Sequence, residues 1–224
     1  MSAATTADLR CAYGKLRVHH LAVGPDDRAP LICLHPAPFD GSYFEGFAQP
    51  FSGDRNVLAP DYPGYGKSAA PPARPTVDDY AGALLAALLT LTPGKLHLLG
   101  FHTGCLVACE MALQQPERIG DLVLIDVPYF NGIAQQKKYA ESVTDQPDSW
   151  GFAAAFSYPC AARFAALDKR ALVIATGSNL AEPTQEAAAA LKNARLENCA
   201  DVTRPALKNG RDQFVDLIRA FLHD

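Results

Sequence analysis

The sequence has few of the features that mark disulfide-rich, metal-binding or membrane proteins. Its 224 residues contain six cysteines, too few for a disulfide scaffold, and none forms a Cys-x-x-Cys pair. The longest mostly apolar stretch, residues 81–91, is much shorter than the ~20 residues of a membrane-spanning helix. The first residues lack the basic-then-apolar pattern of a secretion signal. We therefore expect a cytoplasmic protein with no membrane partner, whose thiols are free and buried.

An excess of positive charge is also missing. Twenty Lys and Arg residues stand against 24 Asp and Glu residues, which gives a formal net charge of −4. A nucleic-acid partner is therefore not expected. Residues 66–68 (Gly-Lys-Ser) look like the end of a phosphate-binding loop, but the glycine required five positions earlier is Asp61. We expect no nucleotide, no other cofactor and no metal ion.

The chain does contain a regular alternation of short apolar runs and helix-forming segments after residue 30. Apolar runs of this kind are typical of strands that are buried on both faces of a parallel sheet. The segments between them are rich in Ala, Leu and Glu, which favours helices. The predicted strands are residues 31–34, 56–59, 96–99, 122–125 and 171–175, and the predicted helices are residues 76–91, 104–115, 183–193 and an amphipathic segment around 214–222.

The pattern predicts an α/β fold with a mostly parallel central sheet, helices on both faces and one domain over residues 1–224. Residues 9–23, broken by Gly14, predict an antiparallel hairpin ahead of that sheet. Residues 129–169 interrupt the alternation with several aromatic residues and prolines. We predict that this segment is a short, lid-like insertion over one edge.

Residues 96–115 carry the clearest chemical signal. A strand-like run leads into Gly100-Phe101-His102-Thr103-Gly104, and a helix-forming segment follows. Two glycines that flank one residue at a strand-to-helix turn are typical of a nucleophile elbow, because they let the chain make a crowded turn with the central side chain pointing outward. Serine, cysteine or aspartate is expected at the centre. This sequence has His102 there.

Four motifs in order, spread over essentially the whole chain, resemble the α/β-hydrolase superfamily. Besides the elbow, residues 34–38 are similar to its oxyanion loop, residues 59–68 to its Asp-x-x-Gly-x-Gly-x-Ser loop, and residues 115–126 to its passage from a helix into the sixth strand. The resemblance implies the α/β-hydrolase fold, which does not by itself imply an activity. It also implies that the backbone N–H groups of Ala37 and Thr103 are oxyanion donors.

The same comparison of motifs shows that all three positions of the catalytic triad have changed. His102 replaces the elbow serine, residues 178–180 (Ser-Asn-Leu) stand where the acid is expected, and Thr203-Arg204 stand where the catalytic histidine is expected. A serine-hydrolase mechanism needs an activated hydroxyl, a base within reach and an orienting acid. A conventional serine esterase is therefore not expected.

His102 is the first catalytic candidate, since an imidazole that faces the pocket suits a general base or a hydrogen-bond partner of the substrate. Asp126, at the end of the sixth strand, is expected to orient it. Capping of the turn after that strand is an equally good interpretation of Asp126. His35 in the oxyanion loop is a further catalytic candidate, with a structural hydrogen-bonding role as its alternative.

We expect an enzyme that acts on a small carbonyl or ester substrate, with His102 as general base or hydrogen-bonding catalyst. The alternative is a catalytically silent homologue that binds a small ligand or a protein partner. The intact elbow glycines favour the enzyme, and the loss of the triad favours the silent homologue. Electron transfer or nucleotide binding is the weakest hypothesis, because the glycine-rich fingerprint is missing. A homodimer remains one option for the oligomeric state.

Overall fold

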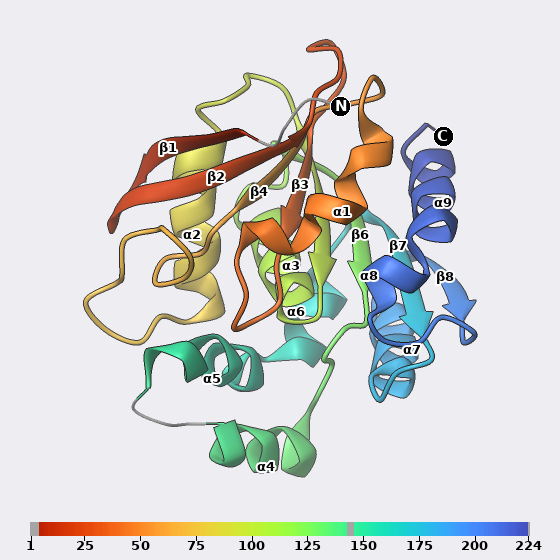
Figure 1. Cartoon of the computed structure of the whole chain (residues 1–224). Coiled ribbons are helices and arrows are strands. Elements are labelled where there is room, and N and C mark those ends of the chain that lie inside the picture. The colour runs from red at the N-terminus through yellow and green to blue at the C-terminus, as the bar shows by residue number, and fades with distance from the viewer. Residues whose placement is uncertain (1–4, 143–145, 224) are drawn as a thin grey trace.

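The computed structural model describes residues 5–142 and 146–223. An eight-stranded sheet in the order β1-β2-β4-β3-β5-β6-β7-β8 forms its centre (Figure 1). Strand β2 runs antiparallel to both β1 and β4, and the other neighbours are parallel, which confirms the predicted sheet and hairpin. The strands are β1 (Thr5–Cys11), β2 (Gly14–Ala22), β3 (Leu31–Leu34), β4 (Val57–Pro60), β5 (Leu96–Phe101), β6 (Ile119–Ile125), β7 (Arg170–Thr176) and β8 (Asn193–Cys199).

Helices cover both faces of the sheet, with α2 and α3 on one face and α1, α8 and α9 on the other (Figure 1). Three short 3-10 helices lie in the connections. The helical elements are η1 (Gly41–Phe44), α1 (Glu45–Ala48), η2 (Gln49–Phe51), α2 (Val77–Leu88), α3 (Thr103–Gln114), α4 (Gly132–Ser142), η3 (Pro147–Ser149), α5 (Trp150–Ser157), α6 (Cys160–Ala166), α7 (Ala181–Ala190), α8 (Ala206–Asn209) and α9 (Arg211–His223). No helix in the two described ranges is long and apolar enough to cross a membrane.

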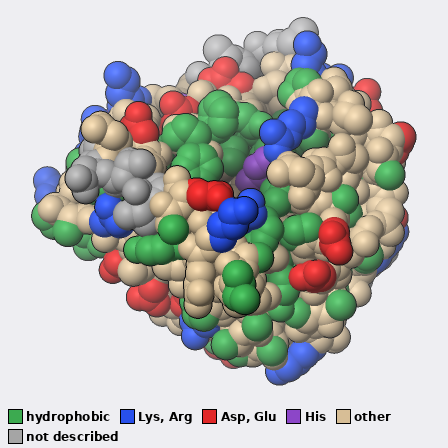
Figure 2. All heavy atoms as spheres, turned by 90° about the horizontal axis from the view of Figure 1, so that it is seen from below, with side chains coloured by type: hydrophobic (Ala, Val, Ile, Leu, Met, Phe, Trp, Pro, Cys, Tyr) green, Lys and Arg blue, Asp and Glu red, His purple; other side chains and the backbone are tan. Residues whose placement is uncertain are grey.

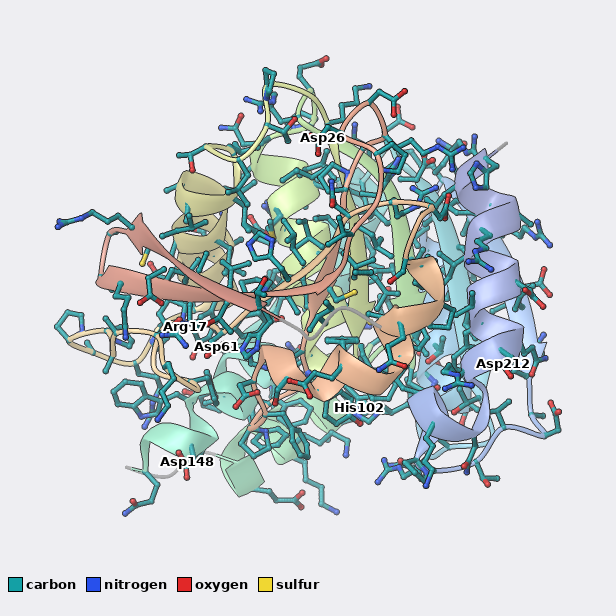
Figure 3. The ribbon with its side chains drawn as sticks, turned by 45° about the horizontal axis from the view of Figure 1, so that its top comes forward. Arg17, Asp26, Asp61, His102, Asp148 and Asp212 are labelled. Atoms are coloured by element: carbon teal, nitrogen blue, oxygen red, sulfur yellow. The ribbon has the colours of Figure 1, made fainter. Side chains whose placement is uncertain are left out.

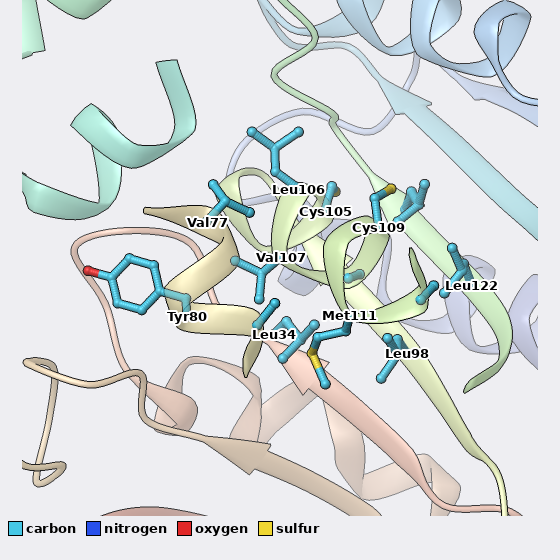
Figure 4. Packing of buried hydrophobic residues seen from close by; sticks show 14 of the residues in the cluster. Leu34, Val77, Tyr80, Leu98, Cys105, Leu106, Val107, Cys109, Met111 and Leu122 are labelled. Carbon is cyan, nitrogen blue, oxygen red and sulfur yellow. The ribbon is translucent and has the colours of Figure 1, made fainter. Parts of the chain in front are cut away.

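The central strands supply side chains to two separate cores because successive residues of a strand point to opposite faces. In β3, Ile32 and Leu34 pack into the cluster beneath α2 and α3, whereas Leu31 and Cys33 pack against α1 and α9. Figure 4 shows the first of these clusters from close by. Burial on both faces explains why most residues of such strands are apolar and why the sequence pattern locates them.

The start of α2 is specified locally by a capping box. Thr76 Oγ1 accepts a hydrogen bond from Asp79 N (3.1 Å), and Asp79 Oδ2 accepts one from Thr76 N (2.9 Å). This reciprocal pair satisfies two backbone donors that the first turn of a helix leaves without partners.

The predicted helix at residues 183–193 differs from the structure at its end. Helix α7 stops at Ala190, and residues 193–199 form the edge strand β8. This strand is half-exposed and carries the ion pair between Arg195 and Glu197 (2.8 Å). Charged side chains protect an open sheet edge from pairing with other chains, and they also remove the apolar run by which strands are recognised.

Residues 129–169 contain α4, η3, α5 and α6, with residues 143–145 of this predicted lid outside the described ranges. Figure 1 shows α4 and α5 beyond the arrowheads of the parallel strands. Helix α5 packs closely there: Gly151 N donates to Tyr65 Oη (2.9 Å), and a Cβ at Gly151 would lie 2.7 Å from the Cβ of Ala37. The segment therefore lies against the loop that follows β3.

The Asp-x-x-Gly-x-Gly-x-Ser loop is closed by the buried Asp61 carboxylate. Asp61 Oδ1 accepts a hydrogen bond from Gly41 N (2.9 Å) and lies 2.8 Å from His19 Nε2, and Oδ2 accepts one from Lys67 N (2.8 Å). Gly66 has a φ of +52°, and a Cβ there would overlap this carboxylate. The motif is therefore a clasp, the Asp61 clasp, that joins three segments beside the sheet.

We predict that His19→Gln lowers the free energy of unfolding more at about pH 5.5 than at about pH 9. The hydrogen bond to Asp61 raises the pKa of His19 in the folded protein above its ordinary value of 6.5, although burial opposes the rise. The stabilisation by this contact is therefore complete below pH 6.5, and it is lost as the pH rises through the pKa of His19 in the folded protein. Burial tends to raise the pKa of Asp61, but its hydrogen bonds from His19, Lys67 and Gly41 lower it overall, so this carboxylate stays charged down to below 3.8.

Urea denaturation measures the effect, which should be on the order of 1 kcal/mol at the lower pH. His20→Gln is the matched control, because burial lowers the pKa of this neighbouring imidazole and no charged partner raises it. An equal loss in His19→Gln at both pH values would contradict the prediction.

Candidate functional site

The turn between β5 and α3 places His102 at the carboxyl end of the parallel strands. Its backbone has φ 51° and ψ −120°, a conformation that residues other than glycine rarely adopt. His102 N donates to Ile125 O (3.1 Å), and His102 O accepts from Cys105 N (2.9 Å). The helix begins at the next residue, Thr103, one residue before the predicted start.

The two glycines of the elbow are required by close packing. A Cβ at Gly104 would overlap the carbonyl oxygen of Leu34 in β3, and a Cβ at Gly100 would lie 2.5 Å from backbone atoms of Cys105. Neither obstacle can move without shifting a strand or a helix. The glycines therefore allow α3 to approach the sheet closely enough to make the sharp turn at His102.

The His102 side chain is 24% exposed and opens into a cleft of about 420 Å³. Figure 2 looks onto this end of the molecule and shows a histidine in a hollow between hydrophobic side chains, with a basic side chain beside it. Figure 3 places His102 at the end of the sheet opposite Asp26. The described lining residues include no serine, cysteine or carboxylate. They are Pro36, Ala37, Pro38, Phe39, Tyr43, Phe101, His102, Phe152, Arg204, Pro205 and Ala206.

The buried carboxylate of Asp126 lies near the imidazole of His102. The distance between Asp126 Oδ2 and His102 Nε2 is 3.8 Å, which is an ion-pair distance and longer than a direct hydrogen bond. Thr176 fixes the carboxylate, because its N–H donates to Oδ1 (3.0 Å) and its hydroxyl to Oδ2 (2.7 Å). Burial tends to raise the pKa of Asp126, but His102 and Thr176 together hold it below its ordinary value. Asp126 is thus a fixed anion.

Ala37 and Thr103, the two expected oxyanion donors, are in contact with each other. The N–H of Ala37 donates to the side-chain hydroxyl of Thr103 (2.8 Å), and both residues are buried. A substrate oxygen that binds the Ala37 N–H must therefore displace this hydroxyl.

His35 is fully buried. Its Nδ1 donates to Pro36 O (3.0 Å), its Nε2 accepts from Tyr62 N (3.1 Å), and its ring stacks on that of Tyr62 at 3.9 Å. Burial lowers the pKa of His35 to about 4, so the ring is neutral. Because both ring nitrogens are engaged, this geometry favours the structural alternative for His35. Of the three catalytic candidates, the structure brings His102 and Asp126 together.

The two segments expected at the remaining triad positions are joined by a hydrogen bond. Arg204 Nη2 donates to Asn179 Oδ1 (2.9 Å), and Arg204 lines the same cleft as His102. Asn209 Nδ2 donates to the carbonyl oxygens of Thr203 (3.0 Å) and Arg204 (3.2 Å), which fixes the loop before α8. In the sequence, these positions stand out only because the expected acid and histidine are missing. The sequence does not reveal that Arg204 brings a cation to the cleft.

One further group, His19, Asp40 and Asp61, has ligand atoms within 4.8 Å of one another, a spacing that suits a metal ion. Both oxygens of Asp61 already accept hydrogen bonds in the Asp61 clasp. Asp40 Oδ1 accepts from Ser42 N (2.9 Å) and Ser42 Oγ (2.6 Å). His19 and Asp61 are therefore engaged in the clasp, and Asp40 is engaged by Ser42.

Comparison with known proteins places the chain in a family. Residues 29–173 match the model of the alpha/beta hydrolase fold family, and the chain belongs to it. It is 34% identical over 108 residues to a pimeloyl-(acyl-carrier protein) methyl ester esterase of Aeromonas salmonicida (strain A449), a match that covers 48% of this chain and 40% of that protein.

It is also 34% identical over 116 residues to a 2-hydroxy-6-oxononadienedioate/2-hydroxy-6-oxononatrienedioate hydrolase of Burkholderia vietnamiensis (strain G4 / LMG 22486), covering 50% of this chain and 40% of that one. The chain thus spans well under half of these two relatives. A crystal structure of a hydrolase from Pseudomonas aeruginosa PA01 has the same fold, with a TM-score of 0.80, 20% identity and 100% of both chains covered.

We predict that Thr103→Val lowers the free energy of unfolding by about 1–3 kcal/mol, because it leaves the buried Ala37 N–H without an acceptor. Valine has nearly the shape of threonine, so the loss reports on the hydroxyl. Thr103→Ser, which keeps the hydroxyl, should lose much less stability. Urea denaturation of the three proteins gives the comparison, and equal stability of the two variants would refute the role given to this contact.

Proposed function

We propose that this chain is an enzyme that acts on a small carbonyl or ester substrate in the His102 cleft, with His102 as its general base. One observation carries the proposal. His102 is the one imidazole among the described residues that line the cleft, and imidazole is the side chain that most often serves as a general base.

Asp126 supplies the orientation in this proposal. Its fixed carboxylate favours the tautomer in which His102 Nε2 carries the proton and faces the anion, at 3.8 Å. Nδ1 is then the basic nitrogen. With an ester, Nδ1 takes a proton from water as the water oxygen bonds to the carbonyl carbon, and returns it to the departing alkoxide, which gives the acid and the alcohol.

The charge that develops on the carbonyl oxygen needs donors. We propose the N–H of Thr103, at the start of α3, and the N–H of Ala37 after the Thr103 hydroxyl has turned away. The apolar walls of the cleft support this proposal, because exclusion of water strengthens such hydrogen bonds.

We further propose that residues 129–169 act as a short lid on a single domain of residues 1–224. Phe152 of α5 forms part of the cleft wall, which supports this role. A cytoplasmic location and a small-molecule substrate complete the proposal and rest on the sequence.

The second candidate is a catalytically silent homologue that binds a ligand or a protein partner. Two distances favour it: the 2.8 Å bond that occupies the Ala37 N–H, and the 3.8 Å between His102 and Asp126, which is too long for a hydrogen bond. A substrate that displaces the Thr103 hydroxyl from the Ala37 N–H and shortens the distance between His102 and Asp126 would favour the enzyme. Catalytic hydrogen bonds often tighten only in the complex.

We predict that His102→Ala lowers turnover by about 10²–10⁴-fold, the usual contribution of a general base. A screen of esters, lactones and β-diketones with wild type finds the substrate for the comparison. His223→Ala, which removes a histidine at the far end of α9, should keep full activity. For a silent homologue, no compound turns over and His102→Ala only weakens ligand binding. Full activity in His102→Ala would remove the residue from the mechanism.

We also predict that a fluorophosphonate probe does not label the protein. Ser68 Oγ accepts a hydrogen bond from Arg17 N (2.9 Å) and donates one to Asp61 O (2.7 Å), and Ser178 Oγ accepts from Leu180 N (3.1 Å). Neither hydroxyl lines the His102 cleft. Intact-mass spectrometry after incubation tests this, and stoichiometric labelling of either serine would contradict it.

A further inference from the structure

Arg204 brings a positive charge into a mostly apolar cleft. It is the one Lys or Arg among the described lining residues, and none of the ion pairs formed by the described residues involves it. Arg163, by contrast, meets a carboxylate, that of Glu110. Arg204 instead has an amide oxygen, Asn179 Oδ1, as its partner.

That hydrogen bond holds the guanidinium without neutralising it. A guanidinium has five N–H donors, and Asn179 engages one of them through Nη2. The loop that carries Arg204 is fixed by Asn209, which donates to its backbone carbonyl (3.2 Å). The charge also reaches the cleft wall, where it moderates the rise that burial causes in the pKa of Tyr43.

We propose that Arg204 binds a carboxylate group of the substrate and so sets the substrate class of the His102 cleft. The inference rests on the proposed function in that it takes this cleft as the substrate site. The reacting carbonyl then lies at His102, and the carboxylate lies at the Arg204 side of the same cleft. The position at which the superfamily carries a base thus carries a binding group in this chain.

A carboxylate fits this site better than a phosphate group. The planar guanidinium donates two parallel hydrogen bonds to a carboxylate, which matches one arginine to one negative charge. A phosphate monoester carries up to two negative charges and three acceptor oxygens. Two other basic side chains, Lys208 and Arg211, line a separate groove that shares Tyr43 with this cleft.

The test compares N-methylsuccinamate, which has one carboxylate, with N,N′-dimethylsuccinamide, which has none, by isothermal titration calorimetry. Both resist hydrolysis. We expect wild type to bind the carboxylate at least about 10-fold more tightly, the low end of the range for a hydrogen bond to a charged group, because Arg204 is exposed. Arg204→Gln should abolish this preference. Lys208→Gln, the matched loss of a charge next to the cleft, should retain it.

Asn179→Asp provides a sharper variant because it keeps Arg204. A carboxylate at position 179 would pair with the guanidinium and compete with the ligand, so we expect the preference for N-methylsuccinamate to fall about 10-fold. Asn179→Ala removes the anchor without adding charge and should retain most of the preference. If Asn179 only stabilised the loop, the aspartate variant would bind at least as well as the alanine variant.

Each remaining outcome decides against the inference. Equal affinity of the two succinyl compounds for wild type, or equal losses in Arg204→Gln and Lys208→Gln, would overturn it. Tighter binding of methyl phosphate than of N-methylsuccinamate would overturn the choice of a carboxylate. Thermal unfolding without ligand checks that each variant is folded.

The same titration in His102→Ala separates this inference from the proposed function. A preference that persists in His102→Ala supports the Arg204 site whatever the base is. Turnover that depends on His102 without any preference for the carboxylate would leave the proposed function standing and remove the Arg204 site.

Discussion

The close approach of helix α3 to strand β3 is the constraint on which the site depends. A side chain at Gly104, in the first turn of α3, would overlap the Leu34 carbonyl oxygen, so the helix can pack against β3 only with glycine at this position. The residue that precedes the helix must then turn sharply, and His102 takes a φ of 51°. Strain of this kind persists only where the surrounding structure holds it, and here the backbone bonds from His102 to Ile125 and Cys105 do so. The backbone conformation of this turn therefore directs the His102 imidazole toward the cleft.

The same packing explains which parts of the fold the sequence predicts well. Doubly buried strands such as β3 and β5 need continuous apolar runs, and the elbow needs its glycines, so both leave a direct mark in the sequence. Strand β8 leaves no such mark because it is an edge strand with Arg195 and Glu197 on it. Helices α4 to α6 are also missed as helices, since aromatic residues and prolines in residues 129–169 suggest only an irregular excursion.

The site itself is predicted less completely, because its decisive contacts join residues far apart in the sequence. His102 and Asp126 are identifiable from the ends of adjacent strands. The bond between Ala37 and Thr103 spans 66 positions, and that between Arg204 and Asn179 spans 25. Threonine and asparagine give no signal of these roles, since both occur in many turns and caps. The motif that predicts Ala37 as a donor therefore cannot show that its N–H is already engaged.

Arg204, Asn179 and His102 together set the chemistry of the cleft. A guanidinium cannot serve as a base near neutral pH, so Arg204, which stands where the resemblance leads us to expect the triad histidine, is not a candidate for proton transfer. An aspartate at position 179 would neutralise the arginine, whereas Asn179 supports it and leaves its charge in place. On the other side, the anion Asp126 lies beside His102. The proton acceptance proposed for His102 and the charge recognition proposed for Arg204 belong to one mostly apolar cleft, and a substrate with a carbonyl at one end and a negative charge at the other suits both.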